Sequence, residues 1–172
     1  MSRLRAERIV GIGASAGGLS ALKRLFASLR ERETGAAYVV VQHLDPNHPT
    51  STPSILEKVS GCKVDEASVG IDIEPNRVYT APPGSYLAIE QGRFALHETP
   101  LTRHTRRPID FFMRTLADDR GASAVGIVLS GTGTDVSQGV RDIKSAGGAV
   151  LVQDPQDAEF DGMPRSAIDT GI

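Results

Sequence analysis

The sequence lacks several features that would each point to a particular class of protein. It has one cysteine, Cys62, no tryptophan, and only 5% aromatic residues in 172. A single cysteine cannot form a disulfide within the chain, which is typical of a reducing compartment. Scarce aromatic residues provide no platform for stacking bases, and a net charge of −2 provides no basic surface for phosphates. We therefore expect no nucleic-acid partner.

Long hydrophobic runs are also missing. No apolar stretch approaches the roughly 20 residues that a transmembrane helix needs. The first eight residues lack the apolar segment of a secretory signal. We therefore expect no membrane insertion and a cytoplasmic location. The length predicts one domain over residues 1–172, large enough to bury a core without metals or disulfides.

Short apolar runs alternate with helical patterns along most of the chain. Core strands are predicted at Arg8–Ile12, Tyr38–Val41, Ala124–Leu129 and Ala149–Gln153. Helices are predicted at Gly18–Leu29, Ser54–Val59, Ile109–Leu116, Val136–Ser145 and Met163–Ile168. Shorter strands follow at Arg77–Thr80, Ser85–Ile89 and Arg93–Leu96, the last two as a hairpin. This order predicts a doubly wound, mostly parallel α/β sheet with helices on both faces and a small antiparallel hairpin.

Three polar breaks directly follow predicted core strands. Ser15 in Gly13-Ala14-Ser15-Ala16-Gly17 follows the first strand, His43 the second and Asp135 the third. Ligands bind at the carboxyl ends of parallel strands, so we expect these side chains to meet at one edge of the sheet. They have the residue types of a nucleophile, a general base and an orienting carboxylate. The N–H of Ala16, at the start of the next helix, is a natural oxyanion donor.

Each of these residues also has a purely structural interpretation. Ser15 fits a turn or a helix cap, and His43 fits a hydrogen-bonded structural histidine. Asp135 fits the N-cap of the helix that follows it. The three positions taken one at a time therefore leave the hydrolase hypothesis open.

Two other kinds of site share parts of the same sequence. Gly11–Gly17 has the spacing of a loosened dinucleotide-binding turn, but no acidic residue ends the second strand as that motif requires. His43, Asp45 and His48 are metal-ligand types within one proline-containing loop, although no further cluster completes a familiar site. The basic stretch Arg103–Arg107 fits either a solvated loop or a surface that docks an acidic protein.

Four ordered motifs resemble the catalytic domain of the CheB-type chemotaxis protein-glutamate methylesterases. They are Ile12–Gly18, Val40–Leu44, Leu129–Asp135 and Gly162–Ile168. The resemblance implies a doubly wound α/β fold and a triad of Ser15, His43 and Asp135. It implies oxyanion donors from the backbone of Ala16 and Thr132. It also places Met163 near the cleft as a substrate-binding residue, and it implies neither a cofactor nor a metal.

The activity implied by the resemblance is hydrolysis of glutamate methyl esters on chemoreceptors, with deamidation of certain glutamines as a related reaction. The order Ser…His…Asp differs from the Ser…Asp…His order of α/β-hydrolases. Pro108–Phe112 and Gln153-Asp154-Pro155 are similar to esterase segments of hybrid proteins that also carry methyltransferase and sensor modules. No receiver domain precedes Arg8, so we do not expect a fused receiver to regulate the site.

The chain departs from the family pattern beside the proposed site. Family members commonly have threonine where this chain has Ala16. They commonly have Gly-Met-Gly-Asn-Asp-Gly where it has Gly131-Thr132-Gly133-Thr134-Asp135-Val136. We expect Val136 to restrict a turn that glycine would leave free. These departures support a second hypothesis, a catalytically weak interaction or regulatory module of a larger signalling protein.

Overall fold

The computed structural model describes residues 5–30, 32–44, 50–98 and 106–172. Its strands are β1 (Arg8–Ala14), β2 (Ala36–Gln42), β3 (Val64–Glu66), β4 (Val78–Thr80), β5 (Ser85–Glu90), β6 (Arg93–Glu98), β7 (Ala124–Val128) and β8 (Ala149–Val152). Its helices are α1 (Gly18–Leu29), α2 (Thr52–Ser60), α3 (Pro108–Arg120), α4 (Ser137–Ser145) and α5 (Gly162–Ile168). Apart from the short strand β3, the order of strands and helices is the one that the sequence predicts.

The main sheet has six strands in the order β3-β4-β2-β1-β7-β8, and every neighbouring pair is parallel. β5 and β6 form a separate antiparallel hairpin. Gln91 and Gly92, the two turn residues, both have positive φ, which suits the right-handed twist of the strands. The predicted fold class is therefore confirmed, including the hairpin.

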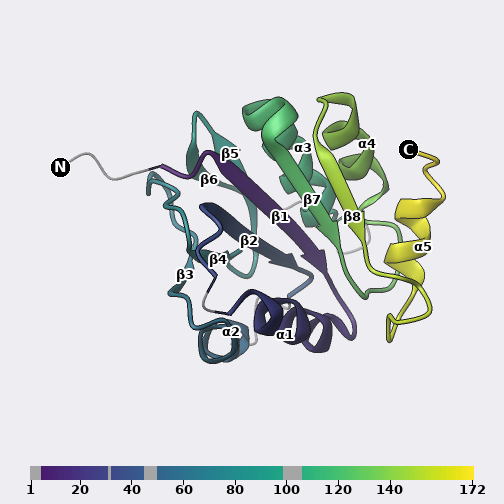
Figure 1. The fold of residues 1–172 in the computed structure, drawn as a ribbon. Coiled ribbons are helices and arrows are strands. Elements are labelled where there is room, and N and C mark those ends of the chain that lie inside the picture. Colours follow the sequence, from purple (N-terminus) through teal and green to yellow (C-terminus); the bar gives the residue numbers. More distant parts are fainter. Residues whose placement is uncertain (1–4, 31, 45–49, 99–105) are drawn as a thin grey trace.

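The chain leaves the middle of the sheet in two directions, as Figure 1 shows. After β1 it passes through α1 to β2 on one side, and after β7 it passes through α4 to β8 on the other. β1 and β7 are neighbours, with Gly13 paired to Val128 near their carboxyl ends. This is a topological switch point, where open α/β sheets place their ligands.

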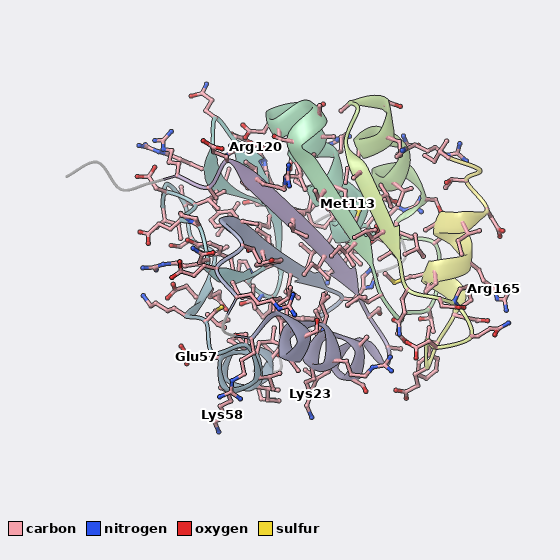
Figure 2. The ribbon with its side chains drawn as sticks, viewed as in Figure 1. Lys23, Glu57, Lys58, Met113, Arg120 and Arg165 are labelled. Carbon is pink, nitrogen blue, oxygen red and sulfur yellow. The ribbon has the colours of Figure 1, made fainter. Side chains whose placement is uncertain are left out.

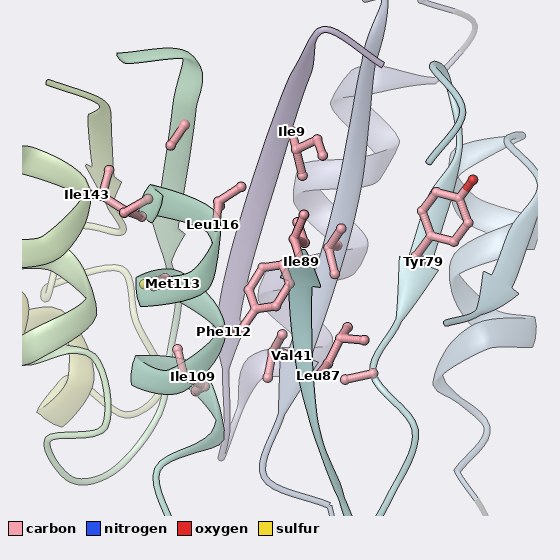
Figure 3. Packing of buried hydrophobic residues seen from close by; sticks show 14 of the residues in the cluster. Ile9, Val41, Tyr79, Leu87, Ile89, Ile109, Phe112, Met113, Leu116 and Ile143 are labelled. Atoms are coloured by element: carbon pink, nitrogen blue, oxygen red, sulfur yellow. The ribbon is translucent and has the colours of Figure 1, made fainter. Parts of the chain in front are cut away.

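Helices cover both faces of the sheet. On one face, α1 and α2 bury Leu22, Phe26 and Leu56 against β1, β2 and β4. On the other face, α3 and the β5–β6 hairpin pack side by side against the sheet, and Figure 3 shows Phe112 and Met113 of α3 in that layer. Figure 2 shows charged side chains such as Lys23 and Lys58 extending away from the sheet. No helix in the described ranges is long and apolar enough to cross a membrane.

α3 approaches β1 closely because two strand residues have no side chain. A Cβ on Gly11 would lie 2.8 Å from Cε1 of Phe112, and one on Gly13 would lie 2.5 Å from Cγ2 of Ile109. Both glycines are inside β1 rather than in the turn that follows it. They serve helix packing, which gives the glycine spacing of Gly11–Gly17 an explanation other than dinucleotide binding.

Two parts of the sheet differ from the prediction. β3 was not predicted, because a three-residue strand has too few positions to show a pattern. β8 was predicted as a core strand, but it is the edge of the sheet and alternates exposed and half-buried residues. Leu151 in this strand is 60% exposed. A short apolar run does not show whether a strand has one neighbour or two.

Candidate active site

Ser15 follows β1 immediately and lies at the switch point. Its N–H donates to the Ser130 carbonyl at 3.0 Å, and its carbonyl accepts the Gly18 N–H at 2.9 Å. The left-handed conformation in this turn belongs to Gly17, with φ of +69°, where a Cβ would lie 2.7 Å from Ser130 Oγ. The turn therefore needs glycine at position 17, and its hydrogen bonds fix the serine backbone.

His43 and Asp135 are in direct contact, although 92 positions separate them in the chain. His43 lies just after β2, and its Nε2 is 2.7 Å from Asp135 Oδ2. Asp135 is only 6% exposed. Its Oδ2 also accepts the N–H of Ile109 at 3.1 Å, and its Oδ1 accepts the N–H of Asp110 at 3.0 Å. Three donors hold this carboxylate in one orientation.

Asp135 does not cap the helix that follows it. α4 begins at Ser137 with Val136 as its N-cap, and no side chain makes the capping hydrogen bond. The two N–H groups bound by Asp135 belong instead to the first turn of α3. The structural interpretation of Asp135 as the cap of its own helix is therefore wrong.

The loop that ends in Asp135 lies directly against Ser15. A Cβ on Gly131 would lie 2.9 Å from Cβ of Ser15, so only glycine leaves room there. Within the described ranges, Ser15 Oγ makes no hydrogen bond, whereas the His43–Asp135 bond is already formed. Catalytic hydrogen bonds are often long before substrate binds. Serine, histidine and carboxylate thus lie around the same edge of the sheet.

Two backbone N–H groups near Ser15 are available to a ligand. Among the residues that the structure describes, the N–H groups of Ala16 and Thr132 donate to no protein acceptor. Ala16 is half-buried at the start of the turn into α1, and Thr132 is exposed in the loop after β7. Backbone N–H groups without a protein acceptor are the kind of donor that can stabilise an oxyanion.

Met163 lies under the loop rather than on its surface. Its side chain is fully buried, and its sulfur occupies the space that a Cβ on Gly131 would need. Its N–H donates to the Gly131 carbonyl at 2.9 Å. The structure therefore places Met163 beside the site, as a support for the loop.

Val136 is the N-cap of α4, at the end of the loop that follows β7. Its φ of −158° and ψ of −18° lie outside the left-handed region that favours glycine. Its side chain is fully buried with the α3 and α4 residues. The left-handed position in this loop is Gly133, with φ of +85°. Valine at position 136 therefore contributes to the core beside α3 and α4.

Sequence reasoning missed Ser130, which connects the loops around the site. Its Oγ donates to the Ala16 carbonyl at 2.8 Å and accepts the Phe160 N–H at 2.9 Å. Its N–H donates to Gln153 Oε1 at 2.8 Å. Ser130 lies inside the motif that follows β7, and its full burial is what distinguishes it from a surface serine.

The basic stretch and the metal hypothesis are only partly covered by the described residues. Arg103–Thr105, Asp45 and His48 lie outside them. Arg107 is engaged within the protein, because its Nη2 donates to the Thr134 carbonyl at 2.6 Å. No group of three or more histidine, cysteine or acidic residues in the described ranges could hold a metal ion.

The fold and the site together define an α/β domain with a hydrolase-type arrangement at the switch point of its sheet. The family model described as CheB methylesterase matches residues 10–172. The chain belongs to the CheB methylesterase family.

Relatives and a solved structure are similar over nearly the whole chain. A protein of Leptospira interrogans named putative protein-glutamate methylesterase/protein-glutamine glutaminase is 37% identical over 164 residues, 95% of this chain and 84% of that protein. A Photorhabdus laumondii protein named protein-glutamate methylesterase/protein-glutamine glutaminase is 33% identical over 98% of this chain. This chain spans only 49% of that relative. The crystal structure of the Thermotoga maritima CheB methylesterase catalytic domain matches with a TM-score of 0.87 at 31% identity, over 95% of this chain and 88% of that one.

Proposed function

We propose that this chain hydrolyses glutamate methyl esters on a methylated chemoreceptor or a related signalling protein, with Ser15, His43 and Asp135 as its triad. The observation that carries the proposal is the 2.7 Å bond between His43 Nε2 and the buried Asp135 carboxylate, beside the Ser15 turn. Membership of the CheB methylesterase family supplies the substrate class. Deamidation of glutamine is the related reaction, because an amide and an ester present the same carbonyl to the nucleophile.

The proposed reaction uses each contact described above. His43 Nε2 is bonded to Asp135, so Nδ1 is the nitrogen left to take the proton from Ser15 Oγ as it attacks the ester carbonyl. The N–H groups of Ala16 and Thr132 receive the negative charge that develops on the carbonyl oxygen. The C–O bond to methoxide then breaks, and His43 returns the proton to release methanol. Water repeats the sequence on the acyl-enzyme and releases glutamate.

We also propose a setting for this activity. The chain acts as one catalytic unit in the cytoplasm, where the methylated parts of chemoreceptors are accessible. The segments Pro108–Phe112 and Gln153–Pro155 support a place beside methyltransferase and sensor modules in a longer protein. Co-purification of methyltransferase activity with the full-length natural protein would test this arrangement.

The experiment that tests the proposal measures methanol released from receptor carrying labelled methyl esters. Ser15→Ala should lower the rate by about 10³-fold or more, because the nucleophile is lost. Ser20→Ala is the matched control, since Ser20 is an exposed serine in the first turn of α1, shortly after Ser15 in the chain. Its rate should equal that of the unmodified chain. Equal rates for both variants would reject Ser15 as the nucleophile.

A further inference from the structure

The N-termini of α3 and α4 are capped reciprocally by two aspartates. Asp110, in the first turn of α3, accepts the N–H of Gly139 in the first turn of α4 at 2.7 Å through Oδ1. Asp135, which precedes α4, accepts the N–H groups of Ile109 and Asp110 in α3. Asp110 of α3 thus caps α4, and Asp135, which lies just before α4, caps α3. The orientation of Asp135 therefore depends on where α3 begins.

This exchange brings two buried carboxylates together. Asp110 and Asp135 are each only 6% exposed. Burial raises the pKa of the Asp110 carboxyl; the Gly139 N–H opposes this rise, and the Asp135 carboxylate adds to it. Two neighbouring buried acids repel each other and need a cation to remain ionised together.

Arg107 is the cation between them. Its Nε lies 3.0 Å from Asp110 Oδ2 and 4.0 Å from Asp135 Oδ1. Its Nη2 donates to the carbonyl of Thr134 at 2.6 Å and to the Thr134 hydroxyl at 3.1 Å. One guanidinium thus contacts Asp110 and the residue just before Asp135. The planar fork of arginine makes these contacts at once, which a lysine ammonium cannot reproduce.

Arg107 is itself held from a third direction. Its backbone N–H donates to the hydroxyl of Tyr86 on the β5–β6 hairpin at 2.7 Å. The ring of Tyr86 packs against Phe111 of α3, with centroids 5.0 Å apart. The arginine therefore joins the hairpin, the start of α3 and the loop after β7 at one point.

We propose that Arg107 is a positioning residue for the His43–Asp135 pair. It holds the turn at Thr134 and Asp135 against the N-terminus of α3, and it offsets the charge of the two buried acids. The carboxylate then faces His43 in a fixed direction. This proposal rests on the proposed function, because it assigns Arg107 a role through the triad and no contact with substrate.

The main test is kinetic. Arg107→Ala should lower kcat on the order of 10- to 100-fold, because a small displacement of a catalytic group is enough for a loss of that size. KM should change by less than about threefold, since no substrate contact is removed. Arg107→Lys should recover only part of kcat, and added methylguanidinium should raise the rate of Arg107→Ala. A folded Arg107→Ala or Arg107→Lys variant with unchanged kcat would overturn the proposal.

Arg114→Ala is the matched control. Arg114 lies within α3, the helix whose N-cap is Arg107; it is exposed and stacks over Phe111 with its guanidinium carbon 5.3 Å from the ring centre. It is two turns beyond Arg107 and so lies on a similar side of α3. Its removal should leave kcat unchanged. An equal loss in both variants would point to a general effect on the helix and contradict the proposal.

A double-mutant cycle separates positioning from a loss of overall stability. In a chain that already carries Asp135→Asn, adding Arg107→Ala should lower kcat by less than twofold, because the residue through which Arg107 acts is already changed. Full additivity would overturn the proposal. If Arg107→Ala is too unstable to assay, the same cycle can be run with Arg107→Lys, which keeps the positive charge.

A measurement without turnover distinguishes this proposal from the proposed function. The proton between His43 Nε2 and Asp135 should give a slowly exchanging NMR signal in the unmodified chain and in Arg114→Ala. It should exchange faster in Arg107→Ala. A chain that shows this difference but releases no methanol would contradict only the proposed function. A signal unchanged in Arg107→Ala would contradict the positioning role, whatever the activity.

Discussion

Two histidine–carboxylate pairs in this chain have almost the same length and very different surroundings. His43 is 2.7 Å from Asp135, and His97 is 2.8 Å from Glu90. The His43 and Asp135 side chains are 31% and 8% exposed, whereas those of His97 and Glu90 are 48% and 56% exposed. The hydrogen-bond distance alone therefore does not distinguish a candidate catalytic pair from a surface pair.

The difference lies in what else holds the carboxylate. Asp135 accepts two backbone N–H groups from α3 as well as the imidazole. Glu90 ends a hairpin strand in solvent, where an ion pair contributes little because water and salt screen it. The His97 ring instead rests on Phe111, with centroids 5.5 Å apart. The second pair is thus a built-in control for experiments on the first.

The largest effect should come from removing each histidine in turn. His43→Ala should lower the rate of methanol release by about 10³-fold, within the range that general acid–base catalysis contributes. His97→Ala should leave the rate within about twofold, since surface changes of this kind have small effects. Steady-state kinetics on methylated receptor would measure both. A comparable loss in the two variants would remove the functional distinction between the pairs.

Replacing the carboxylate of each pair should also lower activity only for the His43–Asp135 pair, by a smaller factor than replacing its histidine. Asp135→Asn should lower kcat on the order of 10²-fold, because the amide can donate to His43 and favour the wrong tautomer. Glu90→Gln should keep full activity. The assay is again methanol release, with circular dichroism to confirm that both variants are folded. Full activity in Asp135→Asn would show that His43 needs no orienting anion.

A glycine lies near each pair, and replacing the two glycines should affect stability and activity differently. Gly131→Ala places a Cβ against the Met163 sulfur and 2.9 Å from Ser15 Cβ. It should lower the free energy of unfolding by about 1–3 kcal/mol and activity by about tenfold. Gly92→Ala strains a turn with φ of +76° and should cost about 1 kcal/mol without loss of activity. Urea unfolding beside the activity assay would separate the two effects.

The smallest effect concerns the pH dependence of stability. The Asp110 pKa is raised in the folded chain, mainly by burial, so the protonated form is favoured there. Its contribution to stability is present below the unfolded pKa of 3.8 and is lost as pH rises through the higher folded value. The unfolding free energy of the unmodified chain, minus that of Asp110→Asn, should therefore fall as pH increases above 3.8. Urea titrations at several pH values would measure this; a difference that rises with pH would contradict it.

The sequence predicted the fold where local patterns are long enough to show it. The bounds predicted for α1, Gly18–Leu29, are those of the structure, because a repeating apolar face and the glycines before it define the helix locally. β3 was missed because Val64–Glu66 is too short for a pattern. The exposure of β8 was missed because its place at the edge is decided by strands that are distant in the chain.

The candidate site was predictable only in part, because local patterns do not show which distant residues pack together. Residue types after strand ends indicated Ser15, His43 and Asp135, whose catalytic roles remain predictions. The partners of Asp135 were not predictable, because capping rules consider the helix that follows a residue and not one that packs beside it. Arg107 and Asp110 have local explanations at the start of α3, so nothing in the sequence separated them from ordinary helix ends.

The pairing of β1 with β7 sets the order in which the site can form during synthesis. Ser130 Oγ binds the Ala16 carbonyl across 114 positions of the chain. The ribosome therefore releases the Ser15 segment long before the strand and loop that complete its surroundings. Parallel pairings over such separations form slowly, because a long loop must close first. Appearance of esterase activity in a translation reaction should lag behind synthesis of the N-terminal half, which makes the activity a late reporter of folding.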